Sequence, residues 1–160
     1  TKLLRQVHAW HEHLNREGGV VCQRWRPSGL RNWDMVEETK ELGTVRWTVR
    51  ELLSSKELVA EGRAMSHCVV SYSDQCAAGD TSIWSICAHR EARPENVLTA
   101  ALDTRRRTVT EARGRYNMLP NRRPASAQGR AQERAGYMTL LRRANAVLNL
   151  WIKREGLQRD

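Results

Sequence analysis

Phenylalanine is absent from this 160-residue sequence, and no apolar run is long enough to cross a membrane. Six tryptophans must therefore supply much of the bulk of the core. A membrane-spanning helix needs roughly 18 or more apolar residues in succession. The N-terminal residues TKLLRQVHAWHEHLNREGG also lack the apolar segment of a signal peptide, because charged residues and histidines interrupt them. We therefore expect a cytoplasmic protein with no membrane partner.

An initiator methionine is absent too, so we expect the chain to be trimmed or to be part of a longer protein. Its length suits one domain with a substantial core. With 40% hydrophobic and 28% charged residues, the composition is typical of a globular protein. No internal repeat stands out, and the sequence predicts a single domain spanning residues 1–160.

Paired cysteines of the Cys-x-x-Cys type are also missing. The four cysteines stand far apart in the sequence: Cys22, Cys68, Cys76 and Cys87. In a cytosolic protein this pattern predicts reduced, mostly buried thiols. A zinc ion held by Cys87, His89 and further donors between His67 and Cys76 is the alternative. Only Cys87 and His89 are closely spaced, so the sequence predicts no metal site and no cofactor.

Excess positive charge is absent from the first two thirds of the chain. Residues 1–103 hold 13 Lys and Arg against 14 Asp and Glu, a net charge of −1. Residues 104–160 hold 14 against 4, a net of +10, and the two sum to the total of +9. Such asymmetry predicts a surface for nucleic acid or another polyanion in the last third. A solvated basic face that serves solubility alone is the alternative.

Apolar periodicity divides the chain into helices and strands. It predicts an N-terminal helix from Leu3 to Leu14 and a helix at residues 56–65, capped by Ser54 or Ser55. Helical spacing then resumes over residues 66–79. Residues 30–43 are expected to form a loop with a short amphipathic piece. The expected strands are residues 20–25, 44–52, 82–88, 96–103 and 107–114, with a hairpin loop at residues 104–107.

The C-terminal helix is the clearest element, because one apolar stripe with helical period runs from Tyr137 to Ile152. A basic loop at residues 116–130 leads to it. The order of elements predicts an α+β fold. We expect a small antiparallel sheet of about three to five strands. It should pack against the N-terminal helix, the central helical segment and the long C-terminal helix.

Residues 61–86, EGRAMSHCVVSYSDQCAAGDTSIWSI, resemble the PcfJ-like family, which conjugative plasmids, phages and other mobile elements encode. The resembling positions are Gly62, Met65, His67, Cys68, Val69, Tyr72, Gly79, Ile83 and Ser85. Downstream, EARGRYN is similar to the family's Gln-x-Arg-Gly-x-x-Asn segment through Arg113, Gly114 and Asn117, although Glu111 replaces the glutamine. The resemblance spans Gln6 to Asn117 and implies a role connected with mobile DNA, without implying a reaction.

A thiol nucleophile is one chemistry that this stretch allows. His67 adjoins Cys68, but neighbouring side chains on a helix diverge by about 100°, so a base from the strands, oriented by Glu111 or Asp103, fits better. Cys68 and Tyr72 would share a helical face and one pocket. The candidate catalytic residues are therefore His67, Cys68, Tyr72 and Glu111. The alternative is a cysteine packed in the core and a tyrosine hydroxyl with a nearby partner.

Nucleic-acid binding is the other chemistry. The candidate residues are Arg105, Arg106, Arg107, Arg113, Arg115, Tyr116, Asn117, Arg122 and Arg123. Arginines bind phosphates, Tyr116 can stack on a base, and Asn117 can read a base edge. Strand alternation predicts Glu111, Arg113 and Arg115 on one face, where Glu111 either activates water, holds a cation or forms a surface salt bridge. The few carboxylates here argue against a metal-dependent nuclease.

We therefore expect a nucleic-acid-associated module of a mobile genetic element that binds DNA or RNA through its basic C-terminal third. One alternative is an enzyme that acts on nucleic acid or a nucleotide through the His67, Cys68, Tyr72 and Glu111 pocket. Another is an interaction subunit whose arginines dock an acidic partner protein. Convergence of His67, Tyr72, Glu111, Arg113 and Asn117 on one cleft would support a site, and dispersal through the core would not.

Overall fold

The structure, a computed structural model, describes residues 22–160 and has an α+β fold, as predicted. Its elements are β1 (Trp33–Thr39), β2 (Gly43–Leu52), α2 (Ser55–Met65), η1 (Val70–Tyr72), α3 (Ser73–Ala77), β3 (Thr81–His89), β4 (Glu95–Asp103), β5 (Thr108–Arg113), η2 (Arg115–Asn117), α4 (Ala127–Arg134), α5 (Tyr137–Glu155) and β6 (Gln158–Arg159). The predicted N-terminal helix lies outside the described residues. Of the strand predicted at residues 20–25, the described part forms only one isolated bridge, between Arg24 and Ser54.

One six-stranded sheet runs through the molecule in the order β1-β2-β3-β4-β5-β6. Strands β1 to β5 form an antiparallel meander, and β6 pairs in parallel with the first two residues of β5. The prediction of about three to five antiparallel strands matches this sheet only roughly. Strand β6 has two residues, too few for any periodicity. The loop expected at residues 30–43 is wrong, because it holds β1, an edge strand whose side chains are all at least partly exposed.

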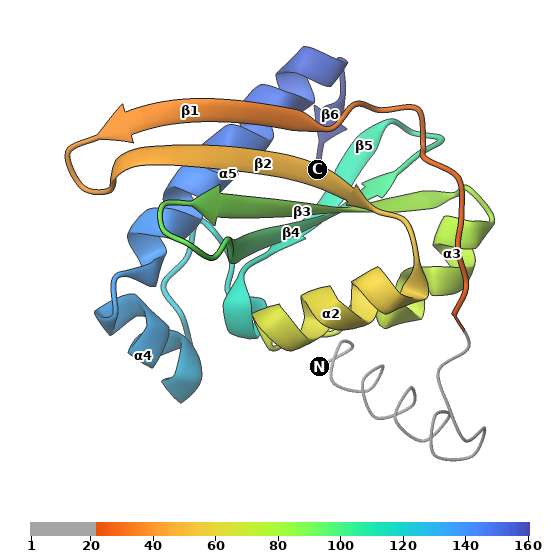
Figure 1. Ribbon diagram of the computed structural model, residues 1–160. Coiled ribbons are helices and arrows are strands. Elements are labelled where there is room, and N and C mark those ends of the chain that lie inside the picture. The colour runs from red at the N-terminus through yellow and green to blue at the C-terminus, as the bar shows by residue number, and fades with distance from the viewer. Residues whose placement is uncertain (1–21) are drawn as a thin grey trace.

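Helix α5 covers one face of the sheet (Figure 1). Tryptophans belong to the core cluster between them. The predicted apolar stripe of α5 is confirmed, since its members are buried. Trp47, Trp84 and Trp151 are completely buried, and the ring centres of Trp84 and Trp151 are 4.5 Å apart. These indoles provide the bulk that the missing phenylalanines would otherwise supply.

The opposite face of the sheet is covered by α2, η1 and α3 (Figure 1). The predicted helix cap is confirmed: Glu57 N–H donates a hydrogen bond of 3.1 Å to Ser54 Oγ. In return, the Glu57 carboxylate accepts a hydrogen bond from Leu53 N–H. This reciprocal arrangement satisfies two backbone donors near the start of α2.

Residues 66–79 do not continue as one helix, so that prediction is wrong. Helix α2 ends at Ser66, which adopts a left-handed conformation with φ 51° and ψ 44°. The chain then turns back so closely that a Cβ at Gly62 would lie 2.7 Å from the His67 carbonyl oxygen. Helical structure returns only in η1 and α3, and Gly79, with φ 81°, ends it as predicted. Local spacing could not reveal this fold-back.

The basic loop predicted at residues 116–130 is shorter than expected. Its first two residues belong to η2, and α4 begins at Ala127, where Ser126 caps the helix by accepting a hydrogen bond from Gly129 N–H. Within residues 22–160, no helix combines the length and the apolar character needed to cross a membrane.

Candidate functional site

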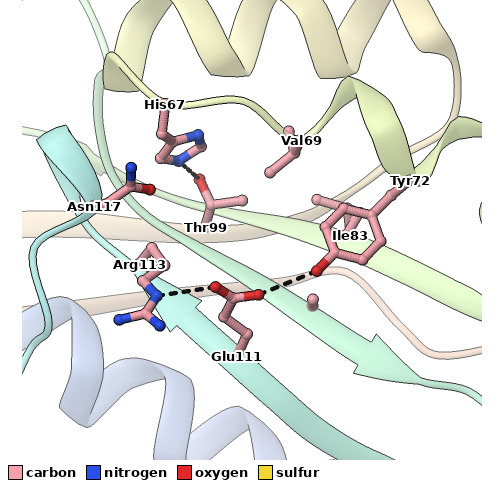
Figure 2. A pocket seen from close by; sticks show the side chains of 9 residues that line it. His67, Val69, Tyr72, Ile83, Thr99, Glu111, Arg113 and Asn117 are labelled. Atoms are coloured by element: carbon pink, nitrogen blue, oxygen red, sulfur yellow. Dashed lines mark hydrogen bonds and ion pairs between the residues drawn. The ribbon is translucent and has the colours of Figure 1, made fainter. Parts of the chain in front are cut away.

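A small cavity lies between the sheet and the chain that leaves α2 (Figure 2). It is lined by His67, Val69, Tyr72, Ile83, Thr99, Ala101, Glu111, Arg113 and Asn117. Its volume is about 20 Å³, which is room for about one water molecule. Pockets for small molecules measure about 300–1,000 Å³. The cavity can therefore receive one chemical group of a larger ligand, but not a whole nucleotide.

His67 reaches this cavity because the chain turns at Ser66. Its side chain is 8% exposed, and Nε2 lies 3.0 Å from Thr99 Oγ1 on β4. Burial lowers the pKa of His67 to about 4, because desolvation disfavours the charged imidazolium. The imidazole is therefore neutral at pH 7.

Behind Thr99 lies a buried carboxylate that the sequence analysis missed. Glu61 on α2 is 3% exposed and accepts hydrogen bonds from Ser85 Oγ (2.9 Å), Asn96 Nδ2 (2.7 Å) and Thr99 Oγ1 (2.5 Å). Burial raises the pKa of Glu61, and these three donors oppose the rise. A glutamate on the same helix face as buried Leu58 is the sequence signal that could have revealed it.

The shared hydroxyl links His67 to Glu61. A threonine hydroxyl has one proton, so when Thr99 donates it to Glu61 Oε2, Thr99 can only accept from His67 Nε2–H. That leaves His67 Nδ1 as an acceptor. In the described part of the chain, neither His67 Nδ1 nor the buried Asn117 Oδ1 has a hydrogen-bond partner. Two hydrogen-bond acceptors in the cavity lining, His67 Nδ1 and Asn117 Oδ1, therefore make no hydrogen bond to the described residues.

Tyr72, Glu111 and Arg113 form a second chain of contacts in the same lining (Figure 2). Tyr72 Oη donates to Glu111 Oε2 at 3.1 Å, and Arg113 Nε donates to Glu111 Oε1 at 2.9 Å. Burial and the Glu111 charge raise the pKa of Tyr72 to about 12. Tyr72 therefore keeps its proton at neutral pH. Glu111 forms a salt bridge with Arg113. The sequence left this salt bridge open as the alternative to a Glu111 that activates water or holds a cation.

Cys68 is the candidate catalytic residue that does not line the cavity. It is buried in a second apolar cluster with Leu58, Cys76 and Ile83. Burial raises the pKa of the Cys68 thiol, so the reactive thiolate is scarce. The expected shared helical face of Cys68 and Tyr72 is also wrong, because α2 ends before Cys68.

The zinc alternative finds no support in the described residues. They contain no group of three or more His, Cys, Asp or Glu side chains placed to hold a metal ion. His89 instead lies with Nε2 3.1 Å from Thr48 Oγ1 and Nδ1 3.2 Å from an Arg46 nitrogen. Cys87 Sγ lies 3.4 Å from Ser85 Oγ.

Residues 23–126, well over half of the chain, match the family model described as PcfJ-like protein. The chain belongs to the PcfJ-like family. No curated protein and no solved structure matches it. All the cavity residues lie within the matched segment, so the family resemblance read from His67, Tyr72 and Asn117 coincides in space with the cavity.

The hairpin arginines of this PcfJ-like chain lie away from the cavity. Along β5, Arg107 is four residues from Glu111, the cavity residue of that strand nearest to the hairpin. At about 3.3 Å per residue this is a separation of about 13 Å. Arg105 pairs with Asp80 at 3.0 Å. Arg106 lies 3.4 Å from Asp160, and Arg107 donates to the Glu155 carbonyl oxygen at 2.8 Å. The structure does not bring these arginines together with the cavity residues.

Arg113 and Arg115 do not share a face as predicted, because β5 ends at Arg113. Arg115 Nε donates to the Asn96 carbonyl oxygen at 3.2 Å, and its guanidinium lies 4.5 Å above the centre of the Tyr137 ring. Arg115 thus ties η2 to β4 and α5. Arg113 is held by Glu111.

Five exposed arginines with few acidic neighbours lie on and around α4. We define the α4 basic surface as Arg122, Arg123, Arg130, Arg134 and Arg142, all of which are exposed. In the described part of the chain, the only ion pair that any of them makes is a 3.6 Å contact between Arg123 and Glu133. Helix α4 contacts η2, whose Asn117 lines the cavity.

Proposed function

We propose that this PcfJ-like chain is a nucleic-acid-binding module of a mobile genetic element, such as a conjugative plasmid or phage, and acts in the cytoplasm. The observation that carries the proposal is the α4 basic surface, where five exposed arginines face solvent with one acidic neighbour. Guanidinium groups bind phosphate oxygens through paired hydrogen bonds. A sequence-independent grip on the phosphate backbone is therefore the interaction that this surface favours.

Several arginines elsewhere in the chain are paired with acidic side chains within the molecule. Arg143 holds Glu37 at 2.6 and 2.9 Å across α5 and β1, and Arg106 lies beside Asp160. Each pair cancels its own charge locally, whereas Arg134 and Arg142 have no acidic partner among the described residues. Arg134 and Arg142 therefore keep their full charge toward an approaching polyanion.

A charge-reversal experiment tests this proposal. The double variant R134E/R142E should bind a labelled oligonucleotide about tenfold or more weakly than wild type near 100 mM salt. Its plot of log affinity against log salt should be shallower by about 1 to 2. Fluorescence anisotropy at several salt concentrations measures both quantities.

The matched control is R105E/R106E, which changes the net charge equally at the distant hairpin. Equal losses in both double variants would contradict the α4 basic surface, since net charge alone would then explain binding. A wild-type affinity that does not change with salt would contradict phosphate binding altogether. Competition by polyglutamate as effective as competition by an oligonucleotide would favour the acidic partner protein instead.

An enzyme acting on bound nucleic acid or a nucleotide is the second candidate function. It is favoured by the convergence of His67, Tyr72 and Glu111 on one cavity, with a neutral His67 in its lining. A cavity the size of one water could admit an attacking water or one reacting group. If H67A and E111Q fold but lose a turnover that C68S retains, the enzyme is supported and the thiol plays no part.

A further inference from the structure

The turn that follows β5 contains two successive residues in a conformation that side chains rarely adopt. Tyr116 has φ 55° and ψ 33°, and Asn117 has φ 61°. Asparagine tolerates the left-handed region, but for tyrosine the Cβ lies too close to the following carbonyl oxygen. Strained backbone of this kind persists only where its surroundings hold it, and it clusters at functional sites.

Contacts on both sides hold this turn in place. Gly114 N–H donates to the Met118 carbonyl oxygen at 2.8 Å, and Arg115 N–H donates to Tyr137 Oη at 2.9 Å. A Cβ at Gly114 would lie 2.7 Å from Tyr137 Oη, so only glycine allows this close approach to α5. On the other side, Arg115 Nη1 donates to Gln132 Oε1 of α4 at 3.2 Å. The turn is thus fixed between α5 and α4.

In this turn, the side chains of neighbouring residues point in different directions. Asn117 enters the cavity lining and Arg115 is tied to β4 and α5, whereas the Tyr116 side chain is left 39% exposed. Among the described residues, only Val36 and Leu150 are other large apolar side chains with comparable exposure. Neither has a left-handed backbone. Core packing gives no reason to hold a strained tyrosine partly in water.

We propose that Tyr116 is a stacking platform for an unpaired base, so that the nucleic acid bound by this chain is single-stranded. This inference rests on the proposed nucleic-acid binding and specifies its ligand. Bases within a duplex stack on one another and offer no free face, whereas an unpaired base stacks readily on an aromatic ring. An exposed aromatic side chain beside a basic surface is the combination that proteins use to bind single strands.

The placement of α4 supports this ligand. Helix α4 contacts η2, and its Gln132 accepts a hydrogen bond from Arg115, the neighbour of Tyr116 in the chain. Arg130 therefore lies on a helix that packs against the turn, and Arg122 lies on the segment that joins the turn to α4. A single strand whose base stacks on Tyr116 would therefore pass directly onto the arginines that bind its phosphates. Stacking with a tyrosine is tolerant of sequence, so this platform alone does not distinguish the bases.

Anisotropy titrations with twelve-nucleotide oligo(dT), twelve-nucleotide oligo(U) and a twelve-base-pair duplex test the inference at low salt. The single strands should bind more tightly than the duplex. Tyr116→Ala should weaken single-strand binding by about 5- to 150-fold and leave duplex binding unchanged. Tyr116→Phe keeps the ring and should retain single-strand affinity, and Leu150→Ala, which removes an exposed side chain from α5, should change nothing.

Tyr116→Gly separates a binding role from a structural one. Glycine adopts the left-handed conformation without strain, so the melting temperature should stay the same or rise while single-strand affinity falls as in Tyr116→Ala. If Tyr116 were there for stability, the melting temperature would fall.

The two proposals fail in different ways. Equal affinity for duplex and single strand, or wild-type affinity in Tyr116→Ala while R134E/R142E loses binding, would overturn the stacking platform and leave nucleic-acid binding intact. Absence of salt-dependent binding to all three probes would overturn both proposals.

Discussion

His67 and Glu61 share the hydroxyl of Thr99, and burial shifts their pKa values in opposite directions. For both residues the buried state favours the neutral form, which lowers the pKa of His67 to about 4 and raises the pKa of Glu61. At acidic pH the unfolded chain binds a proton at His67 that the folded protein does not bind. The folded state should therefore lose stability in acid.

We expect His67 to contribute stability that is complete above pH 6.5 and is lost as the pH falls from 6.5 to about 4. In this window the unfolded histidine binds a proton that the folded one does not, so acid favours unfolding. The shift corresponds to about 3 kcal/mol. Urea unfolding of wild type and His67→Gln at pH 4 and pH 7 measures it, and a stability difference between the two that does not change with pH would contradict the buried, neutral histidine.

At the scale of the element, the end of α2 decides where the cavity residues lie. The left-handed Ser66 and the close approach of the His67 carbonyl to Gly62 turn the chain back toward the sheet. A helix continued past Met65 would carry His67 and Tyr72 away on its own axis, as the sequence periodicity suggested. Gly62 and the left-handed Ser66 thus allow the chain to turn back, which places His67 and Tyr72 at the cavity.

Two substitutions at this turn should have opposite effects on stability. Gly62→Ala places a methyl group 2.7 Å from a backbone oxygen, and this clash should outweigh the gain in helix propensity of about 1 kcal/mol and destabilise the protein by about 1–2 kcal/mol. Ser66→Gly removes a left-handed serine and should stabilise it by up to about 1 kcal/mol. Thermal unfolding measures both, and stabilisation by Gly62→Ala would refute the tight turn.

At the scale of the whole molecule, the family match and the folding core do not coincide. The match ends at residue 126, whereas α5, which lies beyond it, covers one face of the sheet. Leu141, Leu148 and Trp151 of α5 are completely buried. The matched segment by itself would leave the tryptophans of that sheet face in water.

We therefore expect a fragment of residues 22–126 not to fold cooperatively. Without α5, the buried apolar surface on that side of the sheet has no cover, and losing even one large core side chain costs about 3–5 kcal/mol. Near-ultraviolet circular dichroism and amide chemical-shift dispersion would report the loss, with residues 22–160 as the control. A fragment with native-like dispersion would show that α5 is dispensable.

An element with one buried face can be predicted from the sequence, because helical spacing or alternation records which side meets the core. This holds for the stripe of α5. Strands β3 and β4 are buried on both faces, and their runs of apolar and β-branched residues predicted them instead. Strand β1 could not be read this way, since its exposure at the sheet edge removes the contrast between its two faces. Strand β6 depends on its pairing with β5, far away in the sequence. The break after α2 depends on the left-handed backbone of Ser66, which apolar spacing does not record.

The sequence by itself determined the α+β class, the family, the asymmetry of charge and four of the residues that turned out to share a cavity with Arg113: His67, Tyr72, Glu111 and Asn117. Only the tertiary structure decided which of the other candidates join them. Cys68 lies in the core because α2 ends at Met65 and the chain turns at Ser66. Glu61 is the buried partner of Thr99 because its face of α2 packs against the sheet. Likewise, charge counts located the basic third of the chain, but only folding showed which arginines find acidic partners and which remain on the α4 basic surface.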